Sequence, residues 1–113
     1  MVTENVRTKA EELKTAVLDS EEYRNYDMHR RLLNETPELK ARVNEFREAN
    51  VLMQMEHNGE NRTEMQELAD GYNDILTNSV AREFLNSELI LCKMIQQLSA
   101  IILDDIELEL DFL

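Results

Sequence analysis

The longest apolar pattern in the sequence lies near its C-terminal end, and it constrains the fold more than any other feature. Its members recur three and four positions apart, the spacing that places side chains on one face of an α-helix. They are Val80, Phe84, Leu91, Ile95, Leu98 and Ile102. A helix that continues to about residue 105 would be roughly 40 Å long at a rise of 1.5 Å per residue.

This segment has a second apolar side, away from the first. It is formed by Leu85, Leu89, Cys92 and Leu103. A helix that is apolar around most of its circumference is usually enclosed by protein. Because the rest of the chain offers few apolar residues to enclose it, we expect another copy or another subunit to do so. Leu91 and Ile95 should lie at the centre of that packing.

Two helices are predicted before the single proline. The first carries a narrow apolar stripe with helical spacing. The stripe consists of Val2, Val6, Ala10, Leu13 and Val17. Asp19 and Ser20 are placed to end this helix and to cap the next. The second helix carries Tyr23 and Tyr26 and stops before Asn34, since Thr36 precedes a proline and such a residue avoids the helical conformation.

Three segments with start or stop signals follow. A third helix begins at Pro37, with Thr36 as its cap, and ends at Asn58-Gly59. A fourth runs from about residue 63 to 76 and is weakened at Gly71, because glycine costs about 1 kcal/mol relative to alanine in a helix. Asn78 and Ser79 then predict a cap or a kink before the last helix.

The composition agrees with a single helical domain over residues 1–113. The chain has 113 residues with 2 Gly, 1 Pro and no Trp, which is poor material for turns and strands. The predicted fold class is all-α, a bundle of long antiparallel helices with a long apolar C-terminal helix, completed by oligomerisation. The tail, residues 104–113, alternates acidic and apolar residues. It is either a frayed end or a segment that docks on a partner.

The charge is unevenly distributed. The net charge is −12, made up of −2 over residues 1–50 (9 basic, 11 acidic), −5 over 51–79 (1 and 6) and −5 over 80–113 (2 and 7). A nucleic acid would be repelled by the second half, so we expect no direct nucleic-acid binding. The first residues, 1–14, lack the apolar run of a signal peptide, and no run of about 18 apolar residues offers a membrane span. These features predict a cytoplasmic protein without membrane contact.

The residues that usually carry chemistry form no recognisable motif. Tyr26 and Gln54 stand three positions before His29 and His57, where a di-iron bundle would place glutamates. There is no HExxH motif and no glycine-rich phosphate loop. Cys92, the one cysteine, lies in the most apolar run and is expected to be a small core residue. The sequence therefore predicts no catalytic, metal-binding or cofactor-binding residue, and no enzyme.

Three polar residues fall on or beside apolar stripes. Asn50 continues the series Leu39, Val43 and Phe46; it either fixes the register of packing or faces a water-filled gap. Glu88 lies at the edge of the last helix's stripe, where it either pairs with Arg47 or reaches solvent. Gln54, one turn beyond Asn50, is expected to be an ordinary flanking residue.

Three stretches together resemble the YlbF/YmcA family of small helical bacterial proteins. They are SEEYRNY (residues 20–26), TPELKARVNEFREANVLMQ (36–54) and FLNSELILCKMIQQL (84–98), followed by an acidic and apolar end. The resemblance implies an all-α protein that associates with itself or with relatives. By position it carries over Tyr23, Tyr26, Pro37, Glu38, Leu39, Phe46, Arg47, Asn50, Gln54 and Glu88, none of them catalytic in the family.

The resemblance also implies a role. Family members regulate competence, sporulation and biofilm formation in Firmicutes, as subunits of a complex that assists ribonuclease Y in mRNA processing. Iron–sulfur clusters are associated with that complex, but this chain offers only Cys92 as a thiolate ligand, so we expect it to hold no cluster by itself. The first hypothesis is a non-catalytic regulatory subunit. The alternatives are a metal- or redox-linked protein that uses Cys92 across a subunit interface, and a stand-alone helical scaffold.

Overall fold

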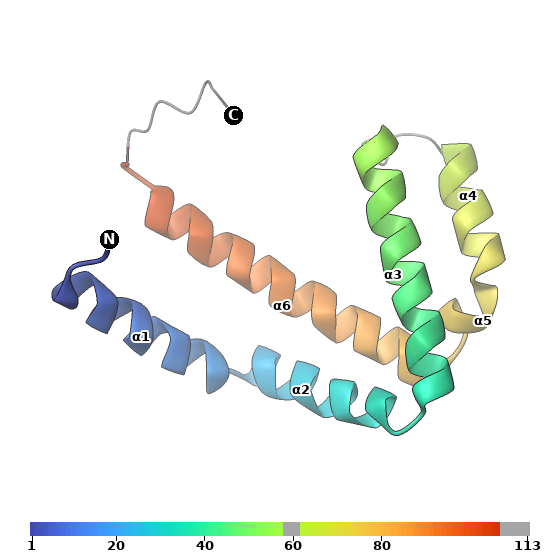
Figure 1. Ribbon diagram of the computed structural model, residues 1–113, viewed down its shortest axis with the longest axis horizontal. Helices are drawn as coiled ribbons and strands as arrows, with labels where there is room; N and C mark the ends of the chain where they lie inside the picture. Colours follow the sequence, from blue (N-terminus) through green and yellow to red (C-terminus); the bar gives the residue numbers. More distant parts are fainter. Residues whose placement is uncertain (58–61, 107–113) are drawn as a thin grey trace.

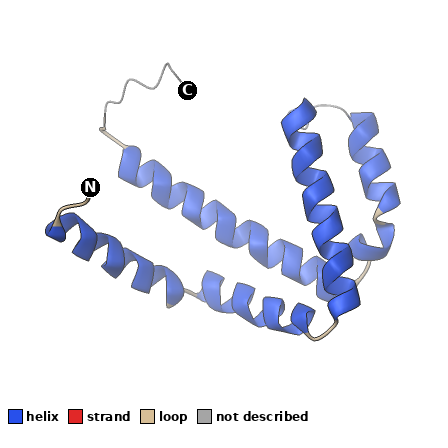
Figure 2. Cartoon of the chain, viewed as in Figure 1, coloured by secondary structure: helices blue, strands red, loops and turns tan. Residues whose placement is uncertain are grey.

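The computed structural model describes residues 1–57 and 62–106, and over these residues it is all helical, without strands (Figure 2). The helices are α1 (Glu4–Leu18), α2 (Glu21–Asn34), α3 (Pro37–His57), α4 (Arg62–Gly71), α5 (Asn73–Leu76) and α6 (Ser79–Leu103). The all-α prediction is confirmed. The predicted stop at Asn58-Gly59 and the tail from residue 107 onward lie outside the described residues.

The helices form two arms that diverge from a common corner (Figure 1). In one arm, α1 and α2 follow one another, and α6 runs back antiparallel to α2; in the other, α3 and α4 form a hairpin. The radius of gyration of the whole chain is 17.7 Å, against about 13 Å for a compact domain of this length. The helices therefore do not close into a bundle along their full length.

The core lies at the corner where the two arms meet. Its side chains come from α2, α3, α5 and α6, and each is at most 4% exposed. They are Leu33, Val43, Ile75, Ala81 and Phe84. Ser87 is also buried, and its hydroxyl donates to the carbonyl oxygen of Phe84 at 2.8 Å. Leu39 and Tyr26 pack against this cluster from outside.

Side-chain caps fix where two helices begin. The hydroxyl oxygen of Ser20 accepts a hydrogen bond from the backbone N–H of Tyr23 (3.2 Å), and the side-chain oxygen of Asn78 accepts one from Ala81 (3.1 Å). Each satisfies a donor that has no partner within its own helix. The fourth predicted helix divides after Gly71 into α4 and α5. The cap at Asn78 and the weakness at Gly71 were both predicted.

The last helix differs in character from its prediction. At 25 residues α6 is the longest described helix, but Arg82, Glu83 and Glu88 interrupt its first half, so it is amphipathic rather than apolar throughout. None of the described helices combines the length and apolar character that a membrane crossing requires. Only Ala81, Phe84 and Ser87 of α6 are buried, all near its N-terminal end.

Candidate interaction surfaces

An apolar groove of about 380 Å³ lies between α1 and the C-terminal half of α6. We call it the α1/α6 groove. Its walls are almost entirely apolar, and they include Leu13 and Val17 from α1 with Leu91, Ile95 and Leu98 from α6. Tyr23, near the start of α2, also lines the groove. Figure 1 shows α1 and α6 separated along this length.

Much of this surface is exposed although its residues are apolar. Ile95 is 47% exposed and Ile102 is 55% exposed, and α1 has no buried residue at all. Leu91 is half-buried. Leu91 and Ile95 were predicted to lie at the centre of the packing. Within one chain they line an open groove instead. The enclosing neighbour that the sequence predicted is not supplied by this chain's described residues.

A second groove, of about 730 Å³, lies between α3 and α6, inside the angle of the two arms. We call it the α3/α6 groove. Its apolar lining includes Val51 and Leu52 from α3 and Leu89 from α6, each more than half exposed. Cys92 also lines it and is exposed. The prediction that Cys92 is a core residue was therefore wrong, because α3 diverges from α6 before it reaches this residue.

An ion pair at the inner end of the α3/α6 groove joins its two walls. The Arg47 guanidinium donates to both carboxylate oxygens of Glu88, at 2.5 and 3.2 Å, and to the side-chain oxygen of Asn44 at 3.1 Å. Its charged carbon lies 5.7 Å from the centre of the Phe84 ring. Of the two alternatives left open for Glu88, the structure thus has the pair with Arg47 and not the solvated carboxylate.

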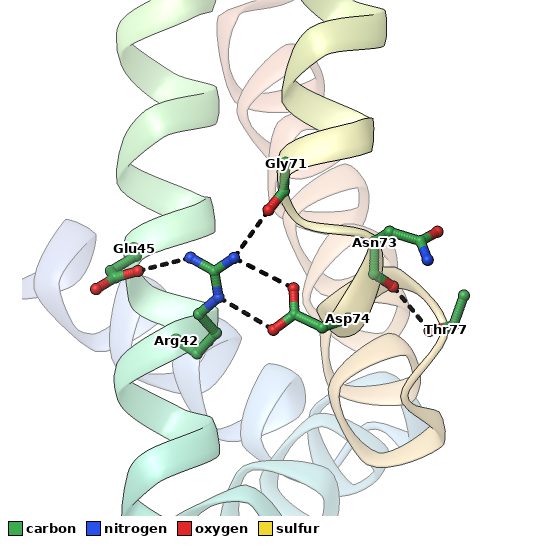
Figure 3. Close-up of polar contacts among 6 residues, drawn as sticks. All are labelled: Arg42, Glu45, Gly71, Asn73, Asp74 and Thr77. Carbon is green, nitrogen blue, oxygen red and sulfur yellow. Dashed lines mark hydrogen bonds and ion pairs between the residues drawn. The ribbon is translucent and has the colours of Figure 1, made fainter.

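A second arginine of α3, Arg42, joins this helix to the end of α4 and to α5. Its role was not predicted from the sequence. Arg42 donates to Asp74 through two nitrogens (3.1 and 3.2 Å), to the carbonyl oxygen of Gly71 (2.8 Å) and to Glu45 (2.9 Å), as Figure 3 shows. Its guanidinium lies 4.2 Å from the centre of the Tyr72 ring. The hydrogen bonds from Arg42 lower the pKa of Asp74, and those to Asp74 and Glu45 raise the pKa of Arg42.

The remaining predicted residues lie near these grooves or the core. The Tyr26 ring is 5.7 Å from Phe84 and 6.3 Å from Tyr23, which links the core to the α1/α6 groove. Asn50 is half-buried and lines both the α3/α6 groove and a hollow of about 150 Å³ between α3 and α4. Phe46 also lines both the groove and the hollow. The exposed Gln54 lines the hollow but not the groove. Asn50 thus sits between two open spaces at a helix crossing.

Titratable groups do not gather into a site within the described residues. No group of three or more His, Cys, Asp or Glu side chains there could hold a metal ion. His29 contacts a single carboxylate: its Nδ1 lies 3.7 Å from Glu83, which joins α2 to α6. The polar contacts described here serve to position helices.

These features define a small all-α protein of two diverging arms with open apolar grooves. The family model described as "Control of competence regulator ComK, YlbF/YmcA" matches residues 6–107. The chain therefore belongs to the YlbF/YmcA family, a family of competence regulators, as the resemblance indicated. It is also similar to a UPF0342 protein from Caldicellulosiruptor bescii (31% identical over 106 residues, 91% of this chain and 89% of that protein). No solved structure matches it.

Proposed function

We propose that this chain is a non-catalytic regulatory subunit that binds a protein partner through the α3/α6 groove, within a complex that modulates ribonuclease-dependent mRNA processing. The observation that carries the proposal is the exposure of Val51, Leu52 and Leu89 at 55, 51 and 51% around one groove. Apolar side chains gathered in this way mark protein contacts more often than isolated ones do. The family's description as competence regulators supplies the regulatory context.

The charge distribution supports binding to protein in preference to RNA. Residues 51–113 carry 3 basic and 13 acidic residues, a net of −10. The phosphate backbone of an RNA would be repelled by these acidic residues. A ribonuclease or a sister subunit carries no such backbone and would not meet this repulsion. In such a complex the partner would bind the RNA, and this chain would position or modify the partner.

The test is affinity capture from the native host with matched variants. We expect the tagged wild-type chain to capture a ribonuclease or related family subunits, and Leu52→Asp combined with Leu89→Asp to lose them, because charge would be placed in a desolvated contact. Met28→Asp is the control, since Met28 is 50% exposed and lies outside both grooves. Capture without any ribonuclease or sister subunit would favour a stand-alone scaffold instead.

A second candidate function is favoured by one observation, the exposure of the Cys92 thiol. Two copies could bring two such thiols together across a symmetric interface, as a metal- or redox-linked protein would require. A visible spectrum of anaerobically purified protein tests this. Absorbance that is lost in Cys92→Ser would support it, and a colourless sample would leave the regulatory subunit as the proposal.

A further inference from the structure

We infer that the occupant of the α3/α6 groove is an amphipathic α-helix of another protein, with apolar side chains along one face and lysine or arginine on both flanks of that face. This rests on the proposed function, which assigns the groove to a protein partner, and it adds the chemistry of that partner. Three observations carry it: the helical walls of the groove, the spacing of its apolar side chains, and the charge around it.

Both walls of the α3/α6 groove are α-helices, and this decides the shape of the occupant. Backbone N–H and C=O groups within α3 and α6 bond along the same helix, so neither wall offers a sheet edge to which an extended peptide could add a strand. A segment buried between them has to satisfy its own backbone groups, and a helix does so. Figure 1 shows α3 and α6 moving apart with distance from the corner, with the inner end of the groove at the Arg47–Glu88 pair.

The apolar side chains of the groove follow the walls at helical spacing. On α6, Leu85, Leu89 and Cys92 lie four and three positions apart. Val51 and Leu52 line the groove from α3. The α6 stretch is about 10 Å long, or roughly two helical turns, at 1.5 Å per residue. A helix laid along it would contact these side chains with residues one turn apart on one face, which is the pattern of helices that bind in apolar grooves.

The charge around the groove favours a basic partner. Residues 48–57 of α3 include two glutamates and no lysine or arginine, and the neighbouring α4 has three acidic residues and one arginine. Arg47, which lines the groove, is already bound to Glu88, while Glu48 is an exposed carboxylate on the same lining. Lysine or arginine beside the apolar face of a partner helix would meet these carboxylates. A second copy of this chain, with a net charge of −12, would bring more acidic residues to them.

The experiment is fluorescence anisotropy of the purified full chain with labelled synthetic peptides of about 18 residues, or roughly five helical turns. The first peptide has leucines along one helical face and lysines on its flanks, and the second has glutamates in place of the lysines. The third has the composition of the first in an order that scatters the leucines. We expect the first peptide to bind at least about tenfold more tightly than either of the others. Equal binding of the lysine and glutamate peptides, or of the ordered and scattered ones, would overturn the inference.

Variants of the chain locate the bound peptide. Leu52→Ser combined with Leu89→Ser should weaken binding of the lysine peptide by about tenfold or more, because both side chains supply apolar area to the contact. Glu48→Lys should weaken the lysine peptide and strengthen the glutamate peptide. Glu67→Lys, at an exposed position of α4 outside the groove, makes the same change in net charge and should change either affinity by less than about twofold. Equal effects of the two lysine substitutions would show binding to the net charge of the chain and would overturn the inference.

The Cys92 thiol gives a measurement on the wild-type protein, because it is exposed in the same groove. Saturating lysine peptide should slow its reaction with a thiol reagent; binding without protection would place the peptide elsewhere and overturn the inference. Protection at high protein concentration without peptide would show a second copy in the groove and would also overturn it. Partner capture in the host is read separately: if capture is lost in Leu52→Asp combined with Leu89→Asp while the peptides bind equally, the proposed function stands and this inference alone fails.

Discussion

Arg47 of α3 and Glu88 of α6 are joined by two hydrogen bonds, 2.5 and 3.2 Å long, although they stand 41 positions apart in the sequence. The pair lies where the two arms begin to diverge, next to the buried Phe84 ring. Asn44 holds the third side of the guanidinium. The ion pair thus joins α3 to α6 at the inner end of the α3/α6 groove.

The first prediction concerns this pair. In a double-mutant cycle with Arg47→Ala and Glu88→Ala, we expect a coupling free energy of up to about 1 kcal/mol, because both side chains are partly exposed (43 and 23%). Urea unfolding of the four proteins measures it. The exposed Lys9–Glu12 pair is the control and should couple less. Equal coupling free energies in the two pairs would mean that the two hydrogen bonds between Arg47 and Glu88 add no stability beyond that of an exposed ion pair.

The second prediction concerns pH. Hydrogen bonds from Arg42 lower the pKa of Asp74 below its ordinary 3.8, so the unfolded chain binds this proton more readily than the folded one. The stability from this contact is therefore fully present above the ordinary pKa, and it is lost as the pH falls through the lowered value. We expect Asp74→Asn to be less stable than wild type at about pH 7 and nearly equal to it at about pH 2.

Urea unfolding at the two pH values measures this difference. Asp70→Asn serves as the control, because Asp70 accepts a hydrogen bond only from the neutral Gln66 side chain one turn earlier. A destabilisation by Asp74→Asn of the same size at both pH values would show that the contact with Arg42 does not depend on the carboxylate charge.

The start signals of the helices could be predicted from sequence because each depends on residues within one turn. Ser20 and Asn78 accept hydrogen bonds from backbone N–H groups three positions ahead, and Pro37 is the first residue of its helix. The pairing of Arg47 with Glu88 was one of two alternatives that the sequence left open, since an acid at the edge of an apolar stripe can also reach solvent. Local chemistry therefore gave the elements and suggested one of the contacts between them.

The divergence of the two arms could not be predicted in this way. The sequence did not single out Arg42, because its partner Asp74 lies 32 positions away and no periodic pattern connects the two. Cys92 was interpreted as a core residue, because an apolar run does not reveal how far along α6 the neighbouring helix continues. Both depend on the angle between α3 and α6, which is a property of the packed corner and not of either helix.

The third prediction concerns the core at the corner. Ile75 is 1% exposed on the short helix α5, and it packs with residues from three other helices. Ile75→Ala should destabilise the protein by about 2–5 kcal/mol, through lost burial and the cavity left behind. Val51→Ala, at a side chain 55% exposed, should change stability by less than about 0.5 kcal/mol. Urea unfolding of both variants measures the contrast, and similar effects would place the core elsewhere.

The fourth prediction concerns the exposed Cys92 thiol in the α3/α6 groove. A thiol reagent such as dithionitrobenzoate should react with the native protein at a rate similar to that of the urea-unfolded chain, because no side chain covers the sulfur. We expect the rate not to depend on protein concentration, because the proposed function assigns this groove to a different protein and not to a second copy. Cys92→Ser provides the blank. A thiol protected from the reagent at all protein concentrations would show that Cys92 is covered within one chain, and one protected only at high concentration would show that a second copy covers the α3/α6 groove.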